Sequence, residues 1–417
     1  MRRFFRALGP GFITGAADDD PSGIATYSQT GALFGTSQLW VVLFSYPFMT
    51  AVQEMCGRIG LVTGKGLAGV IRTYYSRRLL AFAVLLLVIA NTINIGADLG
   101  AMAASINLLI PVPFVITLVV ITLFTLGLQV WVPYPHYARF LKWLTLSLLA
   151  YVVTALIVTH DWVPVLHAAL VPHVFSGKAY LFNLAAFLGT TISPYLFFWQ
   201  ADEEVEEEVM RGQLRGMGKG VPKIKSDDVL NMRIDTALGM LFSNLITFFI
   251  IVSVASTLGS TGAPLVTAAA AASALRPVAG NFAFLLFALG IVGTGLLAVP
   301  VLAGSAGYAV AEALNWREGL GARPSQARGF YGIIALATVV GLFVNLSPAG
   351  PMLMLYWAAM LNGVLAPPLL LILLFIANNK KIMGARTNSW LSNVFGVVIT
   401  LVMGGIALLL LWQTLNP

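Results

Sequence analysis

Long apolar stretches separated by short polar segments make up most of this chain. Eleven stretches are long enough to cross a bilayer: residues 4–34, 38–60, 79–109, 112–131, 137–159, 179–200, 232–258, 281–313, 329–347, 351–377 and 392–415. Each is expected to be a helix, because a helix satisfies its own backbone hydrogen bonds in hydrocarbon. The pattern therefore predicts an all-α integral membrane protein with about eleven transmembrane helices, folded as a single domain over residues 1–417.

The composition supports this prediction. Of the 417 residues 58% are apolar and 10% are charged, whereas soluble domains carry about 25% charged residues. Too few charges remain to cover a water-soluble particle, so lipid is expected to surround the protein. The single Cys56 excludes an internal disulfide and a thiolate metal cluster.

The basic residues predict an orientation. If the N-terminus is cytoplasmic, the cytoplasmic segments hold 22 Lys and Arg residues and the outer segments hold two, Lys178 and Arg276. This asymmetry follows the positive-inside rule, so we expect a multi-pass protein of the cell's inner membrane with its C-terminus outside. The net charge of +7 then reflects topology and requires no nucleic acid. No obligate protein partner is evident.

The sequence 202–208 is strongly acidic and follows the sixth apolar stretch. One interpretation is a solvated cytoplasmic extension of a helix, paired with Arg211 and Arg215. The other is a cytoplasmic vestibule that attracts cations. The sequence does not separate the two.

Proline interrupts two apolar stretches that lie five stretches apart. Pro21 lies in the first stretch beside three aspartates, and Pro194 lies in the sixth after Thr190, Thr191 and Ser193. An odd spacing gives two halves of opposite orientation, and matched interruptions in such halves indicate a transporter binding site. We expect repeat one over about 4–159, repeat two over about 179–377, and an extra helix over 392–415.

The first interruption carries the strongest candidate chemistry. Pro21 removes a backbone donor and opens the helix, which frees carbonyls, including that of Ala17. Asp20 beside them forms a hard, negative oxygen site, or caps the following half-helix, and both roles are compatible. For Asp18 and Asp19 three roles stay open: direct ligation, contact with a water-filled vestibule, and pairing within the bundle.

Several motifs resemble the Nramp divalent-metal transporters. The segment Gly9–Gly23 resembles that family's first helix, whose break reads Asp-Pro-Gly-Asn, and 58–68 is similar to its segment after helix two. Ala97-Asp98-Leu99 resembles the start of its Asp-Leu-Ala-Glu motif, and 190–195 occupies the place of Ala-Thr-Val-Met-Pro-His. The resemblance covers nearly the whole chain. It implies a LeuT-like 5+5 inverted repeat with discontinuous helices 1 and 6, and a transporter rather than an enzyme.

Two departures from the family pattern bear on the ion. The family's ligand Asn is Gly23 here, and its ligand Met is Ser193. A thioether favours soft or borderline ions, and a hydroxyl removes that preference. Both replacements also widen the cavity, which suits an Mg²⁺ ion that keeps several waters. The pattern resembles the Nramp-related magnesium transporters, and we expect transport of Mg²⁺, and also Mn²⁺, with no resident cofactor.

Further ligands follow from position. The carbonyls of Ala17 and Thr190 match coordinating carbonyls of the family. Asn362, which precedes Pro367, places an amide near the site or forms an interhelical hydrogen bond. Asn91 and Asn94 order the ion's water shell or join helices.

Proton coupling has little support in these residues. Proton-coupled Nramp proteins resemble one another in a His and a Glu at the positions of Tyr195 and Ala101 here, and all four histidines fall at span ends or in loops. Asp98 remains as a lone carboxylate. We therefore expect uncoupled uptake driven by the membrane potential, which supplies about 2.3 kcal/mol per charge per 100 mV.

Three other functions can be compared with the same residues. The nearest is a proton-coupled Mn²⁺/Fe²⁺ symporter on the same fold. An aspartate-rich membrane prenyltransferase needs a second acidic cluster at the depth of 18–20, and 202–208 lies at the cytoplasmic end instead. An amino-acid carrier needs an uncharged helix break, where Asp20 would repel its carboxylate.

Overall fold

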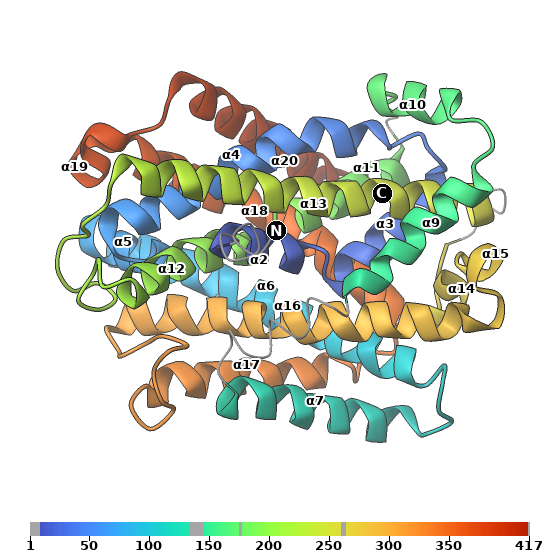
Figure 1. The fold of residues 1–417 in the computed structure, drawn as a ribbon, viewed down its shortest axis with the longest axis horizontal. Helices are drawn as coiled ribbons and strands as arrows, with labels where there is room; N and C mark the ends of the chain where they lie inside the picture. Colours follow the sequence, from blue (N-terminus) through green and yellow to red (C-terminus); the bar gives the residue numbers. More distant parts are fainter. Residues whose placement is uncertain (1–8, 133–144, 175–176, 260–263, 416–417) are drawn as a thin grey trace.

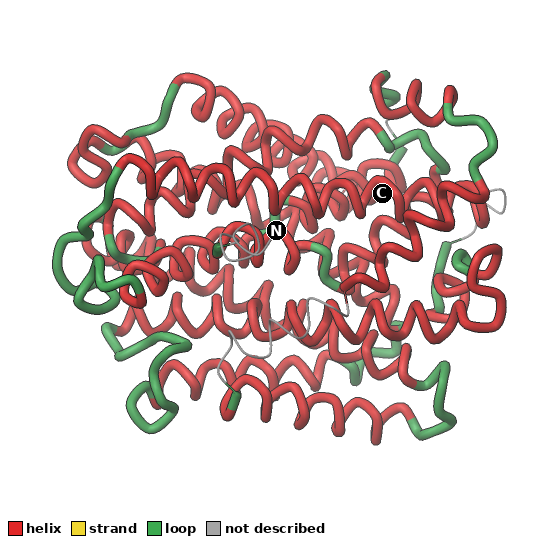
Figure 2. Tube along the Cα trace, viewed as in Figure 1, coloured by secondary structure: helices red, strands yellow, loops and turns green. Residues whose placement is uncertain are grey.

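The computed structural model describes residues 9–132, 145–174, 177–259 and 264–415. Helices and loops make up this part of the chain (Figures 1 and 2). Its α-helices are α2 (Pro10–Asp18), α3 (Pro21–Phe34), α4 (Trp40–Thr63), α5 (Leu67–Tyr74), α6 (Arg77–Ile106), α7 (Phe114–Trp131), α9 (Leu149–Val158), α10 (Val163–Leu170), α11 (Lys178–Thr191), α12 (Pro194–Met210), α13 (Ser226–Leu258), α14 (Ala268–Ser273), α15 (Arg276–Ala279), α16 (Ala283–Leu314), α17 (Arg328–Val344), α18 (Pro351–Asn378), α19 (Lys380–Met383) and α20 (Trp390–Leu415).

Many of these helices have the length and composition of membrane spans. Among the described residues, seven helical segments are long and apolar enough to cross a bilayer, and α9 and α17 are apolar but shorter. The predicted fifth span falls partly on 133–144, outside the described residues, and its end forms α9. Large apolar side chains of α7 and α20 face outward, among them Val115, Leu123, Leu401 and Leu408. The chain is an all-helical, multi-span membrane protein.

The first predicted helix break is confirmed. Helix α2 ends at Asp18, and α3 begins at Pro21, which occupies the first position of the new helix. Asp19 and Asp20 have non-helical backbone angles between them, and Asp20 is the N-cap of α3. Proline is favoured at that first position because its missing N–H has no partner there.

The second predicted break is also confirmed. Helix α11 ends at Thr191, Ile192 and Ser193 leave the helical conformation, and α12 starts at Pro194. In contrast, α18 continues as a helix through Pro367 and Pro368. Two discontinuous helices therefore cross the interior of the bundle.

Glycines hold the two broken helices close to their neighbours. A Cβ atom on Gly15 would lie 2.3 Å from the backbone of Gly239, which places α2 against α13. A Cβ atom on Gly189 would lie 2.3 Å from the backbone nitrogen of Gly363, which places α11 against α18. Such close backbone approaches are typical of small-residue contacts between membrane helices.

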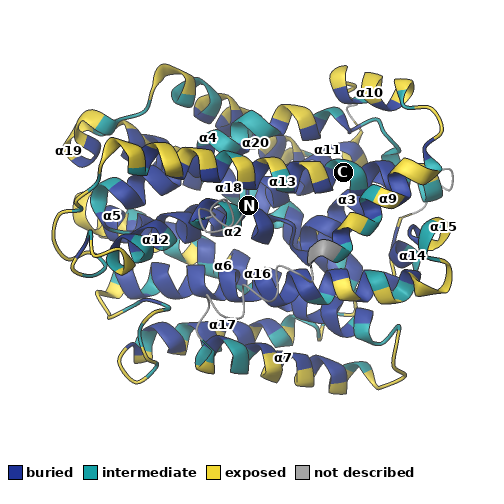
Figure 3. Ribbon diagram, viewed as in Figure 1, coloured by how far each residue is buried: buried dark blue, intermediate teal, exposed yellow. Residues whose placement is uncertain are grey.

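The burial pattern separates an inner from an outer group of helices. Figure 3 shows α2, α3, α12, α6 and α16 mostly in the colour of buried residues, while exposed residues gather on α7, α10 and the end loops. Both helix breaks therefore lie in the protein interior, away from the surface that we expect to contact lipid.

The acidic sequence 202–208 is less solvated than its first interpretation requires. Helix α12 carries it, and Asp202, Glu204 and Glu208 are buried. The predicted pairing with Arg211 is confirmed through Glu207, at 2.5 Å. The interpretation as a solvated extension is therefore wrong for the inward face of this segment, which packs between neighbouring helices.

Candidate metal-ion site

Asp20 is buried, and both of its carboxylate oxygens are engaged. Oδ1 accepts hydrogen bonds from Ser22 Oγ at 2.6 Å and from the backbone N–H of Gly23 at 2.7 Å. Oδ2 accepts from Asn94 Nδ2 at 3.1 Å and lies 3.5 Å from the hydroxyl of Tyr195. Asp20 therefore caps α3, as one of the two sequence interpretations held. These hydrogen bonds hold its carboxylate in a fixed position at the break.

Tyr195 connects the two breaks. Its hydroxyl donates to the carbonyl of Ala17 at 3.0 Å, so the first turn of α12 touches the last turn of α2. The backbone carbonyl of Tyr195 accepts from Ser305 Oγ of α16 at 2.9 Å. The Ala17 carbonyl, freed by the break as predicted, is partly satisfied by this tyrosine.

Gly23 and Thr190 form a second contact between the breaks. A Cβ atom on Gly23 would lie 3.2 Å from Thr190 Oγ1, and this hydroxyl has no hydrogen-bond partner within the described chain. Ser193 Oγ donates to the carbonyls of Gly189 and Thr190, both at 2.8 Å. The Thr190 carbonyl is therefore already engaged, and the unpaired Thr190 group is its hydroxyl, which sequence analysis did not single out.

Asn362 is buried on α18 beside Gly363, the residue that packs against Gly189. Its amide nitrogen has no hydrogen-bond partner in the part of the chain that the structure describes. The structure thus shows no interhelical hydrogen bond from this nitrogen. Asn362 lies near the second break because its neighbour Gly363 packs against Gly189, three residues before Ile192.

Asp18 and Asp19 turn toward α13. Ser243 Oγ lies 2.7 Å from Asp18 Oδ2 and 3.1 Å from Asp19 Oδ1, and both aspartates are buried. The other oxygen of each carboxylate has no partner among the described residues. Both aspartates therefore contact α13 through Ser243, whose single hydroxyl proton goes to one of them at a time.

One face of α6 borders the first break. Asn94, Asp98 and Met102 follow each other at intervals of four residues and are buried, so they share this face. Neither carboxylate oxygen of Asp98 has a hydrogen-bond partner among the described residues. Asn91 instead joins helices, because its amide donates to the carbonyl of Leu302 at 2.8 Å.

Met102 brings a thioether near the first break and is not among the residues predicted from the sequence. A Cβ atom on Gly295 would lie 2.5 Å from the Met102 sulfur and 3.3 Å from Pro21 Cγ. A signal was present, because Met102 lies four residues after Asp98 on a helix and therefore on the same face.

The groups that contact Asp20 are two hydroxyls, one side-chain amide and one backbone N–H, and the Met102 thioether lies near the adjoining Pro21. Within the described residues, no three His, Cys, Asp or Glu side chains lie close enough together to hold a metal ion. His160, His167 and His173 are exposed on or beside α10, as expected, and His136 lies outside the described residues. The arrangement brings the Asp20 carboxylate and several neutral polar groups together at the two breaks.

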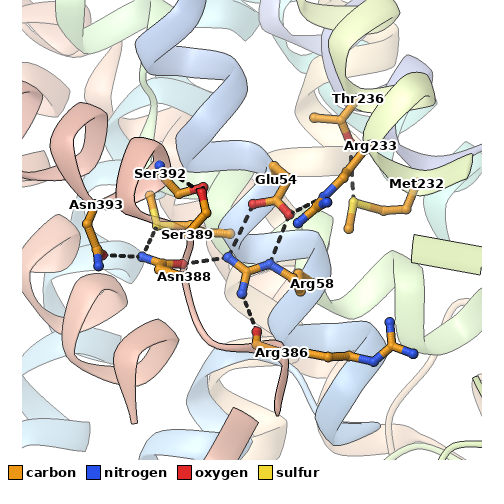
Figure 4. Close-up of polar contacts among 11 residues, drawn as sticks. Glu54, Arg58, Met232, Arg233, Thr236, Arg386, Asn388, Ser389, Ser392 and Asn393 are labelled. Atoms are coloured by element: carbon orange, nitrogen blue, oxygen red, sulfur yellow. Dashed lines mark hydrogen bonds and ion pairs between the residues drawn. The ribbon is translucent and has the colours of Figure 1, made fainter. Parts of the chain in front are cut away.

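A separate charged cluster lies at the end of α4 and has a structural role (Figure 4). Arg58 is buried and pairs with Glu54 at 2.9 Å, and Arg233 of α13 pairs with the same carboxylate at 2.8 Å. Arg58 also donates to the Arg386 carbonyl and to Asn388 Oδ1, so it ties α4 to the segment before α20. Its one carboxylate, Glu54, is shared by two guanidinium groups, which leaves no free carboxylate for an ion.

Comparisons with known proteins agree with this architecture. A family model described as Nramp, natural resistance-associated macrophage protein-like, matches residues 11–413. The divalent metal cation transporter MntH of Deinococcus radiodurans is 25% identical over 427 residues, covering 100% of this chain and 92% of that protein. The MntH of Caldanaerobacter subterraneus is 23% identical over 432 residues, covering 100% and 95%.

Solved structures show the same fold. The Eremococcus coleocola manganese transporter matches with a TM-score of 0.73 at 17% identity, covering 96% of this chain and 85% of that one. The inward-facing structure of Mhp1 matches with a TM-score of 0.56 at 12% identity, covering 98% and 91%.

The fold and the paired helix breaks define a multi-span helical membrane transporter. The family model that matches residues 11–413 identifies the family to which it belongs. This chain belongs to the Nramp family of divalent metal cation transporters, which confirms the expectation that it is not an enzyme.

Proposed function

We propose that this transporter moves Mg²⁺, and also Mn²⁺, as a largely hydrated ion by alternating access. The observation that carries the proposal is the chemistry of the second break. Ser193 stands there with a hydroxyl that bonds to backbone carbonyls, where the resemblance places a ligand methionine. Without that thioether the break has no preference for soft ions.

The contacts around Asp20 fit an ion that keeps part of its water shell. Thr190 Oγ1, Asn94 Oδ1 and Asn362 Nδ2 are buried groups with no hydrogen-bond partner in the described chain. Buried polar groups are normally satisfied by protein or by ordered water. Groups of this kind can bind the waters of a hydrated Mg²⁺, which prefers one or two carboxylates and several waters.

The ligands of this proposal come from both breaks and from α18. Asp20 supplies the charge, and Gly23 places no side chain between it and Thr190. The remaining groups are the Ala17 carbonyl, Thr190, Ser193 and Asn362. Asp18, Asp19, Asn94, Asp98 and Tyr195 form a secondary set that shapes the field and the water structure around the ion.

The proposed architecture is a LeuT-like 5+5 inverted repeat in one domain. Repeat one covers about 4–159, repeat two covers about 179–377, and the extra helix corresponds to α20. Matched breaks in α2–α3 and α11–α12 support this assignment. The Lys and Arg distribution supports a cytoplasmic N-terminus and an outer C-terminus in the inner membrane.

We further propose that transport is not coupled to protons and that the protein belongs to the Nramp-related magnesium branch. Tyr195 and Ala101 occupy the positions of the coupling His and Glu, and Tyr195 donates to Ala17 instead of offering an imidazole. The three described histidines are exposed on or beside α10. The membrane potential alone would then drive uptake.

Flux into proteoliposomes that carry a Mg²⁺ indicator and an internal pH dye tests this function. We expect Mg²⁺ entry that follows an imposed potential, with no acidification that depends on the metal. A vesicle lumen that acidifies as Mg²⁺ enters would overturn the uncoupled reading, and absence of Mg²⁺ entry alongside Mn²⁺ entry would overturn the choice of ion.

A proton-coupled Mn²⁺/Fe²⁺ symporter is the second candidate. The unpaired Asp98 carboxylate and the Met102 thioether near Pro21 favour it, and the Eremococcus coleocola relative is described as a manganese transporter. Loss of Mn²⁺ binding on replacing Met102 would support this candidate over the first.

A further inference from the structure

A small acidic pocket lies away from the helix breaks, where the end of α12, the start of α13 and the start of α2 meet. Its cavity is about 30 Å³, more than the space of about 10–15 Å³ that a single water needs. The charged groups that line it are five carboxylates and one guanidinium: Glu204, Glu207, Glu208, Asp228, Asp235 and Arg211. On α13, Asp235 is eight residues from Ser243, so the pocket lies about 12 Å along that helix from the Asp18–Asp19 contact.

Glu208 is the unexplained group in this pocket. It is 2% exposed, and neither of its carboxylate oxygens has a hydrogen-bond partner among the described residues. An unpaired charge in such surroundings is costly, and buried charges are normally paired or bound to metals. Glu208 therefore points to a ligand that the protein itself does not supply.

The other carboxylates are held in place around it. Asp228 Oδ2 accepts from Gln213 Nε2 at 3.2 Å and from the backbone N–H of Lys225 at 2.7 Å. Glu207 pairs with Arg211, the only cation of the lining within the described residues. Glu204 Oε1 accepts from Gln200 Nε2 at 2.9 Å. The pocket is thus preorganised and carries an excess of negative charge.

The start of α2 forms one wall of the pocket. Asp235 accepts hydrogen bonds from the backbone N–H groups of Gly9 at 2.9 Å and Phe12 at 3.2 Å. A Cβ atom on Gly9 would lie 3.0 Å from Asp235 Oδ2 and 3.4 Å from Glu207 Oε2. Carboxylates from α12 and α13 therefore converge on the first residues of the half-helix that ends at the transport site.

We propose that this pocket is a second divalent-cation site, distinct from the transport site, and that an ion bound there fastens α2 to α12 and α13. Carboxylate oxygens select hard divalent cations. Because no three acids of the described chain gather at direct ligand distances, the ion keeps waters that bridge to Glu208 and its neighbours. Its charge offsets the repulsion among the carboxylates and restrains α2, so the site regulates movement of the first half-helix.

Calorimetric titration of Mg²⁺ into the full-length Asp20→Asn protein tests the pocket around Glu208 after the carboxylate of the proposed transport site has been removed. We expect one remaining class of site, with affinity at least about tenfold weaker in Asp20→Asn/Glu208→Gln. Asp227→Asn in the same background is the matched control: it removes the same charge from an exposed neighbour that does not line the pocket, and we expect an affinity within about twofold of its parent.

Hydrogen exchange supplies a second readout. Mg²⁺ should slow exchange of the α2 amides in the Asp20→Asn protein and leave them unchanged after Glu208→Gln. If Glu208→Gln does not fold, Asp228→Asn takes its place in both measurements. A folded Asp20→Asn protein that binds no Mg²⁺, or one whose binding is unaffected by both pocket substitutions, overturns the proposal. Protection of α2 by low pH but not by Mg²⁺ also overturns it. A wrong assignment of the transport site would give a different result: Asp20→Asn alone would bind as many Mg²⁺ ions per protein as the wild type.

Discussion

The Asp20→Asn substitution removes the one firm charge of the proposed transport site and keeps its shape. The new side-chain oxygen can still accept from Gly23 and Ser22, as Oδ1 does now. The new amide nitrogen at position 20 would face Asn94 Nδ2, which is also a donor. Asn94 Oδ1 has no partner within the described chain, so turning over the Asn94 side-chain amide restores a donor–acceptor pair. Asn and Asp cap helices about equally well, so we expect little change in stability.

The loss in ion binding should be much larger. In the most water-like limit, a divalent ion 4 Å from one negative charge gains about 2 kcal/mol, and a lower dielectric increases this value. That energy corresponds to a loss of affinity of at least about 30-fold. Ser22→Ala is the matched control: it removes one hydrogen bond to Asp20 and no charge, and we expect less than about a tenfold change.

Calorimetry with Mg²⁺ and a thermal unfolding scan measure both quantities on the same sample. For Asp20→Asn we expect an unfolding temperature near that of the wild type together with the large loss of affinity for Mg²⁺. If folded Asp20→Asn binds Mg²⁺ within about threefold of the wild type at both classes of site, Asp20 does not hold the ion.

Three further predictions follow from single residues. Met102→Leu should leave Mg²⁺ uptake within about twofold, because the volume is conserved and a hydrated ion needs no sulfur; a specific loss of Mn²⁺ or Cd²⁺ binding would instead make the thioether a ligand. Gly189→Ala should destabilise the protein by about 1–3 kcal/mol, because its Cβ would lie 2.1 Å from a backbone oxygen of α18, whereas Gly405→Ala meets nothing within 4 Å and serves as control; equal unfolding temperatures would contradict this packing. Burial, and then the charge of Glu312, raise the pKa of Glu318 to about 9. The folded protein therefore loses stability as the pH rises from the pKa of Glu318 in the unfolded chain toward 9. Glu318→Gln should raise the unfolding temperature at pH 8 and flatten its dependence on pH, and an unchanged profile would contradict this raised pKa.

The parts of the fold that the sequence predicted are those with local causes. Pro21 and Pro194 each remove a backbone donor at a fixed position, so both breaks were predictable to within a residue or two. The apolar stretches were readable for the same reason, because crossing hydrocarbon demands a continuous run of apolar residues.

The contacts that the sequence did not predict join residues far apart in the chain. Ser243 meets Asp18 across 225 positions, and Tyr195 meets Ala17 across 178. No local pattern encodes such pairs, since they depend on how α2 packs against α13 and α12. Burial of Glu208 was missed for a related reason: charge density along one segment says nothing about which face a neighbouring helix covers.

The site was therefore half predictable. Asp20 and Ser193 were located by the breaks themselves, whereas the hydroxyl of Thr190 and the sulfur of Met102 depend on the orientation of side chains between helices.

The central claim is that a transport site with the hydroxyl of Ser193, where the resemblance places a methionine thioether, binds a hard, hydrated ion. Calorimetric titration of Mg²⁺ and of Mn²⁺ into the wild type and into Ser193→Met tests it most directly. We predict wild-type dissociation constants for the two ions within about tenfold of each other, and a shift toward Mn²⁺ in Ser193→Met. Wild-type protein that binds Mn²⁺ more than about 100-fold tighter than Mg²⁺ would contradict the account.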